Sequence, residues 1–126
     1  MREERGTIPG DVVVYEPFTL WGTALGNVTV IDGGKLYARG LIHGDLIVEP
    51  GGRVHLFGTV SGSVHVHPDT KVILSGTVGR HAINHGGRLY IDATAKVMGR
   101  VITHAGKTRI QPPPGTARPA RDAVEE

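Results

Sequence analysis

The feature that most constrains this chain is a sequence unit that returns about every 18 residues. Glycines open successive units at Gly10, Gly26, Gly44, Gly62, Gly79 and Gly99, at spacings of sixteen, eighteen, eighteen, seventeen and twenty. Two adjacent units read "GDLIVEPGGRVHLFGTVS" (44–61) and "GSVHVHPDTKVILSGTV" (62–78). A fixed period of this length over residues 10–110 is typical of a solenoid, in which each unit stacks on the previous one.

Apolar residues alternate with polar ones inside each unit, which predicts short strands rather than helices. Three sets of equivalent positions recur, and we expect their side chains to point inward in stacked columns. The first set is Val28, Val30, Leu46, Val48, Val64 and Val66; the second is Leu36, Ala38, Val54, Leu56, Val72, Leu74, Leu89 and Ile91; the third is Ile42, Val60 and Val78. The pattern predicts an all-β fold, a single-stranded parallel β-helix of about five to six turns with roughly 18 residues per turn.

One corner of each turn is marked by a pair of glycines. Gly33-Gly34, Gly51-Gly52 and Gly86-Gly87 occupy this corner, where a positive φ is needed. The third unit carries Asp69-Thr70 instead, and aspartate also tolerates the left-handed region.

Composition sets the organisation of the rest of the chain. The 126 residues suffice for one domain, which we place at residues 10–110, after a flexible N-terminal segment at 1–9 and before a proline-rich disordered tail at 111–126. The chain has no cysteine, so it has neither a disulfide framework nor a cysteine-ligated zinc site. Neither a signal peptide nor a long apolar segment is visible, and we expect a cytoplasmic protein.

His65 and His67 resemble half of a metal site, but the alternation points both outward. We expect His65 to stack between Ile47 and Ala82, His67 to stack between Glu49 and Asn84, and His81 to point inward. Zinc needs three or four converging ligands, and only His85 or Glu49 could join the pair, so we predict no metal or cofactor. A likeness to the first cupin motif fails because Lys71 stands where that motif has glutamate.

A basic residue follows each glycine corner. We call this column the basic ridge: Lys35, Arg53, Lys71, Arg88 and Lys107. Like charges stacked at the strand spacing repel, so the ridge serves either to keep the surface soluble or to bind an anionic partner. The partner would be an acidic membrane surface or an acidic protein; aromatic residues are too few for sequence-specific nucleic-acid binding.

Catalytic signatures are missing from the sequence. There is no Gly-x-Ser-x-Gly, no phosphate-binding loop and no paired carboxylates on neighbouring columns. The six-residue repeat of left-handed β-helix enzymes also fails, because the sixth positions after Val28 are Gly34 and Gly40. We predict that the protein is not an enzyme.

The units around "GDLIVEPGGRVHLFGTVSGSV" resemble the bactofilins, bacterial cytoskeletal proteins that form polymers. The resemblance covers about residues 10–110, and the tail "QPPPGTARPARDAVEE" matches the flank of that family. It implies a right-handed β-helix, end-to-end polymerisation without nucleotide, and a location in the cytoplasm or at the inner face of the membrane.

The ends of a β-helix carry unpaired strand edges, which template another chain unless they are capped. We predict that Phe18 and Leu20 in the first turn, and Val101 and Ile110 in the last, form the polymer contact. The alternatives are a monomeric or small-oligomer binding module that uses the basic ridge and, less favoured, a metal-dependent β-helix or cupin-like enzyme.

Overall fold

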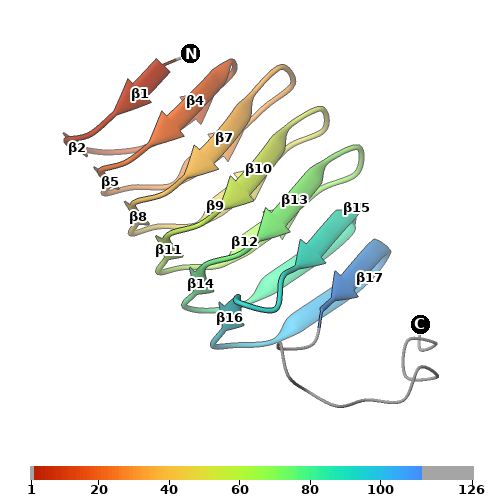
Figure 1. Ribbon diagram of the computed structural model, residues 1–126. Helices are drawn as coiled ribbons and strands as arrows, with labels where there is room; N and C mark the ends of the chain where they lie inside the picture. Colours follow the sequence, from red (N-terminus) through yellow and green to blue (C-terminus); the bar gives the residue numbers. More distant parts are fainter. Residues whose placement is uncertain (1, 112–126) are drawn as a thin grey trace.

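The structure, a computed structural model, describes residues 2–111 and consists there of parallel strands wound into a β-solenoid. It has about six coils spaced about 18 residues apart and no helix within the described residues, which confirms the predicted fold (Figure 1). No helix long and apolar enough to cross a membrane occurs in the described part of the chain.

Each coil contributes strands to three faces, which we call the long, short and third faces. The long face holds β1 (Arg2–Glu4), β4 (Pro17–Leu20), β7 (Lys35–Ala38), β10 (Arg53–Leu56) and β13 (Lys71–Leu74). The short face holds β2 (Thr7–Ile8), β5 (Thr23–Ala24), β8 (Leu41–Ile42), β11 (Thr59–Val60), β14 (Thr77–Val78) and β16 (Lys96–Val97). The third face holds β3 (Val12–Val14), β6 (Val28–Val30), β9 (Leu46–Val48) and β12 (Val64–Val66).

Two longer strands close the solenoid at its C-terminal end. β15 (Ala82–Ile91) pairs first with β12 and then with β13, so it crosses from the third face to the long face. β17 (Val101–Ile110) pairs along β15 and makes the same crossing. All of these pairings are parallel, and the register places Leu36, Val54, Val72 and Leu89 in one column.

The core consists of the aliphatic columns predicted from the period. All the members of the three predicted inward sets are buried. Figure 1 shows why: every strand lies directly above its counterpart one coil earlier, so equal positions meet. The hydrophobic effect across these columns is the main force that holds successive coils together.

The glycine corner has the positive φ that was expected from the sequence. Gly33 and Gly51 have φ of 88° and 90°, and Asp69 at the equivalent corner has φ of 61°. It is the sole non-glycine residue with positive φ in the described chain. The predicted use of aspartate in the left-handed region is therefore confirmed.

The N-terminal segment differs from the prediction. β1 pairs with β4 and β2 pairs with β5, so residues 2–8 complete a first coil. The expectation of a flexible segment at 1–9 is wrong for the described part of that segment, because Glu4 and Ile8 lie in the same columns as Leu20 and Ala24. Residues 112–126 of the predicted tail lie outside the described residues.

The predicted register of the fifth unit is also wrong, by one residue. The backbone amide of Arg80, not that of Gly79, bonds to the carbonyl of Gly62, so Gly79 is not the counterpart of Gly62. A one-residue slip exchanges the two faces of a strand. His81 is therefore exposed, Ala82 points inward above Val64, and His65 stacks on Ile83. Asn84, expected beside His67, points inward above Val66.

A ladder of side-chain hydrogen bonds runs along the corner before the third face. The backbone amide of Asn27 donates to Asp11 Oδ1 at 2.8 Å, and the amide of Asp45 donates to Asn27 Oδ1 at 2.8 Å. The amide of Ser63 donates to Asp45 Oδ1 at 2.8 Å, and His81 and Arg100 continue the series through Ser63 Oγ and His81 Nδ1. Each side chain thus satisfies the backbone of the following coil, which ties the coils together at a corner where no strand pairing exists.

Candidate assembly interfaces

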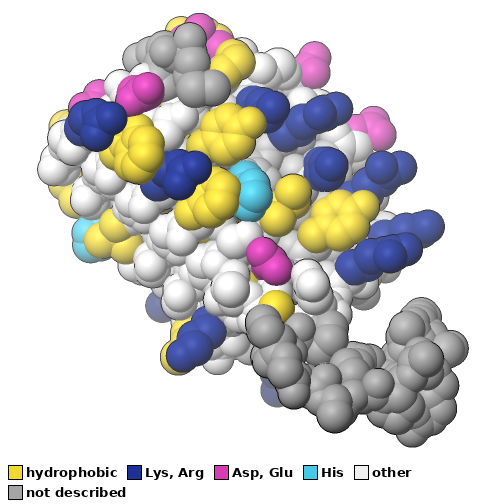
Figure 2. All heavy atoms as spheres, viewed as in Figure 1, with side chains coloured by type: hydrophobic (Ala, Val, Ile, Leu, Met, Phe, Trp, Pro, Cys, Tyr) yellow, Lys and Arg dark blue, Asp and Glu magenta, His cyan; other side chains and the backbone are white. Residues whose placement is uncertain are grey.

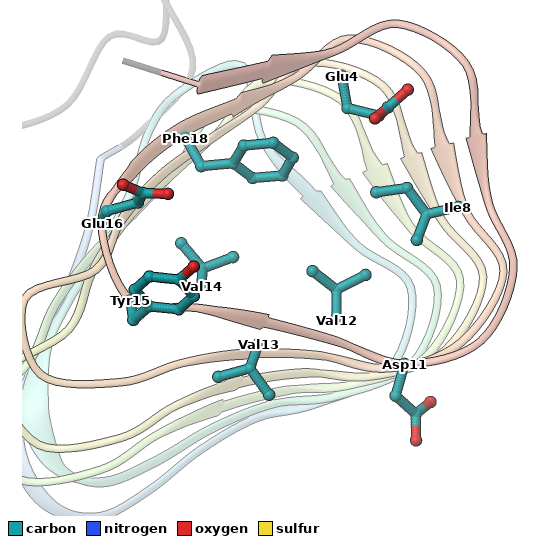
Figure 3. Close-up of a pocket in the computed structure, with 9 residues that line it drawn as sticks. All are labelled: Glu4, Ile8, Asp11, Val12, Val13, Val14, Tyr15, Glu16 and Phe18. Carbon is teal, nitrogen blue, oxygen red and sulfur yellow. The ribbon is translucent and has the colours of Figure 1, made fainter.

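The N-terminal end of the solenoid is an open hollow. Its volume is about 330 Å³, and Glu4, Ile8, Val12, Val14 and Phe18 point into it (Figure 3). β1, β2 and β3 each pair on one side alone within the described chain, so their other edges carry free backbone groups. This end therefore combines apolar surface with unpaired strand edges, the features that template association.

The structure moves one predicted contact residue, Leu20, away from this end. Leu20 lies in the second coil beneath β1 and is only 1% exposed. Phe18 lies in the same coil and is 7% exposed, but its ring lines the hollow. The prediction that the two residues lie in the first turn is wrong because the first coil begins at Arg2 rather than at Gly10. Ile8 and Val12, which the sequence did not single out, line the hollow together with Phe18.

The C-terminal end is formed by β16 and β17. Val101 and Ile110, the two residues predicted for this end, both lie in β17. Val101 is half-buried, whereas Ile110 is 62% exposed. Beside Ile110 is a shallow hollow of about 510 Å³ lined by Tyr90, Ile91, Arg109 and neighbouring residues.

The interior becomes polar at this end. Buried Asn84 donates from Nδ2 to the carbonyl oxygens of Gly87 and Lys107 and to Thr108 Oγ1, at 3.1, 2.9 and 3.1 Å. Its Oδ1 accepts from the amides of Gly86 and Gly87. Thr103 and Thr108 hydroxyls lie 2.7 Å apart in the next layer. The last coil is thus joined to the previous one by a polar network as well as by the apolar contacts of Val97 and Val101 with the core.

The basic ridge is continuous. Lys35, Arg53, Lys71, Arg88 and Lys107 occupy one register position on successive long-face strands, and all are exposed. Figure 2 shows these cations along one edge of the long face, next to hydrophobic side chains. Within residues 2–111, no carboxylate lies at ion-pair distance from Arg53, Lys71 or Arg88. The ridge therefore presents its charge to solvent.

Aromatic and cationic side chains alternate in the neighbouring rows of the long face. The guanidinium of Arg39 lies 5.1 Å from the ring centroid of Trp21 and 4.3 Å from that of Phe57. Phe57 also stacks on His55, with centroids 3.9 Å apart. The flat faces of these rings therefore already contact Arg39 or His55. Bases of a nucleic acid stack on ring faces that are free of such contacts.

The histidines gather more closely than the sequence indicates. The ring centroid of His85 lies 5.7, 5.0 and 5.6 Å from those of His65, His67 and His104, with interplanar angles of 7°, 13° and 22°. Burial lowers the pKa of His85, and the nearby His67, His65 and His104 lower it further when charged.

The rings are stacked rather than arranged around one point. No three histidine or carboxylate groups of the described residues are placed to hold a metal ion. His104 joins the stack because the register between β15 and β17 shifts at Asn84 and His85. Asn84 pairs with Thr103 and His85 with Ala105, so His104 is an extra residue of β17. No sequence pattern signals such an insertion.

No protein-family model, no curated protein sequence and no solved structure matches this chain.

Proposed function

We propose that the protein is a non-enzymatic structural scaffold that assembles end to end through its coil ends into cytoskeletal-type filaments. The observation that supports this most is the open N-terminal hollow with its three unpaired strand edges. Monomeric solenoids normally cover such ends with a polar cap, because an exposed edge pairs with another chain.

The resemblance to bactofilins points the same way, and membership of that family is part of the proposal. So are a cytoplasmic location and a polymer that needs neither nucleotide nor another cofactor. In the alternating rows of the long face, aromatic and cationic side chains pack against one another. An active site instead needs an acid, a base and a nucleophile that converge on one point.

The test is to image the purified protein by negative-stain microscopy and to measure its sedimentation across salt concentrations. Ile8→Arg and Ile110→Arg each place a charge on an end surface that stacking must desolvate, and both should shift the protein to monomers. Leu25→Arg is the matched control, because Leu25 is 49% exposed on the side of the solenoid.

Circular dichroism checks that each variant keeps its β-structure. Folded monomers from the two end variants, with filaments from Leu25→Arg and wild type, support the scaffold. Wild-type protein that stays monomeric at tens of micromolar rules it out.

The unpaired charge of the basic ridge favours a second candidate function, binding of an anionic membrane or acidic protein. Each cation near an anionic membrane surface contributes about 1 kcal/mol. Arg53→Glu with Lys71→Glu should weaken binding to acidic vesicles at low salt, whereas Arg80→Glu with Arg100→Glu, on other parts of the coil, should not. Trp21, the one tryptophan of the chain, lies on the same face and reports contact by its fluorescence.

A further inference from the structure

We infer that the C-terminal part of the long face binds an extended acidic segment of a partner protein, which places an apolar side chain in the hollow beside Ile110 and a carboxylate on the basic ridge. This rests on the second candidate function, the binding of an anionic partner by the ridge, and it specifies that partner. It is carried by the position of the hollow between the ridge cations on one side and a single carboxylate on the other.

The hollow lies on the outer surface of the long face. Ile73 and Tyr90 form part of its wall and point outward, because the residues before and after each of them are buried. Strand pairing places both at one register position with Arg109, on β13, β15 and β17. The volume of about 510 Å³ lies in the range of pockets that take small molecules, so the hollow is large enough for one apolar side chain.

Cations of the basic ridge flank one side of the hollow. Lys71 and Arg88 each lie two residues before Ile73 and Tyr90 on the same strand, and Lys107 continues the ridge on β17. Side chains two residues apart in a strand share a face and are roughly 6.4–6.8 Å apart, whereas counterparts on paired strands are about 4.8 Å apart. A carboxylate on the ridge can therefore lie between two cations, next to the hollow.

The opposite side of the hollow carries a carboxylate. Asp92 lines it there, and its Oδ2 accepts from Ser75 Oγ at 3.1 Å while its Oδ1 accepts from the amide of Ala93 at 2.7 Å. These hydrogen bonds hold the carboxylate in place. An acidic ligand is attracted to the ridge side and repelled from the Asp92 side, so the charges set its orientation.

An extended peptide matches this arrangement better than a bilayer does. A peptide that lies along the strands presents alternate side chains on one side, at the same spacing of roughly 6.4–6.8 Å. Glutamate at one position and leucine two positions later would meet Arg88 and the hollow together. A flat bilayer surface would cover the ridge without filling the hollow. The recognised sequence is therefore an acidic residue, any residue and then an apolar residue.

The probe for the test is a fluorescent peptide in which one serine separates glutamate from leucine. Its binding to the full chain is measured by fluorescence anisotropy at about 0.15 M salt, where long-range attraction is screened. Tyr90→Ala removes one wall of the hollow and should weaken binding by about tenfold. Tyr37→Ala, at the same register position but away from the hollow, should change it by less than about twofold.

A second peptide, with serine in place of leucine, should bind wild type and Tyr90→Ala equally, which assigns the loss to the apolar side chain. Circular dichroism checks that each variant keeps its β-structure. Equal binding of the first peptide to wild type and Tyr90→Ala overturns the role of the hollow.

Two pairs of ridge substitutions give an independent readout. Lys71→Gln with Arg88→Gln removes the charges beside the hollow and should weaken peptide binding by about fivefold to tenfold. Lys35→Gln with Arg53→Gln removes the same charge from the ridge away from the hollow and should change binding by less than about twofold.

Equal losses from the two pairs overturn the peptide site. So does a chain that binds acidic vesicles but not the peptide, although the second candidate function then stands with a membrane as its partner. A chain that binds neither the peptide nor acidic vesicles overturns both.

Discussion

Replacing Asn84 with valine tests how much the buried polar network contributes to holding the last coil. Asn84 is fully buried in the column of Val48 and Val66, so valine would extend an aliphatic column by one level. Burying its side chain would contribute about 1.5–3 kcal/mol. Asparagine instead satisfies the amides of Gly86 and Gly87 and the carbonyl of Lys107.

The free energy lost with these hydrogen bonds exceeds the free energy gained by burying valine. The variant leaves the buried amide of Gly87 and the half-buried amide of Gly86 without an acceptor, and each unsatisfied group costs up to about 1–3 kcal/mol. The carbonyl of Lys107 is nearer the open end and can bond to water. After the apolar gain is subtracted, we expect a net loss of about 1–3 kcal/mol, concentrated in β17.

The assay is hydrogen exchange with thermal unfolding. Amides of residues 101–110 should exchange faster by about tenfold or more in Asn84→Val, while those of the coils before residue 66 keep their protection. Thr29→Val, a half-buried outward position on the same face, should change stability by less than about 0.5 kcal/mol. An Asn84→Val protein with unchanged or greater protection in β17 would show that the aliphatic column could have continued and would refute the role given to the network.

Three further outcomes follow from burial and backbone geometry. Val66→Asp should abolish folding because it buries an unpaired charge, whereas His65→Ala on the outer surface should change the free energy of unfolding by less than about 0.5 kcal/mol; circular dichroism and denaturant titration compare them. Burial lowers the pKa of His55 and His85 below 6.5, so the unfolded chain binds more protons in acid. Their stability contribution should be complete above pH 6.5 and decline as pH falls through the folded-state pKa values, and melting that is insensitive to pH between 7 and 5 would contradict this. Asp69→Gly should be tolerated and Asp69→Val should cost about 1–2 kcal/mol because φ is positive there; equal melting temperatures would argue against that backbone strain.

The period and the alternation were enough to predict the fold and almost all of the core, because Val48, Leu56 and their equivalents repeat at fixed spacing. The first coil was missed because residues 2–8 carry Glu4 at an inward position and have no preceding glycine unit to align with. The slip at Arg80 arose because Gly79, the apparent anchor, lies one residue before the structural equivalent of Gly62.

The candidate interfaces were less predictable than the fold. The basic ridge could be predicted from the sequence because each of its residues follows the glycine corner of a unit. The residues of the N-terminal end could not be assigned from the repeat, because that assignment depended on the first coil. The histidine stack depends on the extra residue His104, which a pattern of identical units cannot anticipate.

The ladder of hydrogen bonds at the corner before the third face favours folding of the coils in order from the N-terminus. Asp11 accepts from the amide of Asn27, Asn27 from that of Asp45, and Asp45 from that of Ser63, so each of these coils holds an acceptor for residues synthesised later. Each pairing closes a loop of only about one coil, so the entropy lost at each step stays small and nearly constant. A chain that emerges from the ribosome N-terminus first can therefore become ordered one coil at a time.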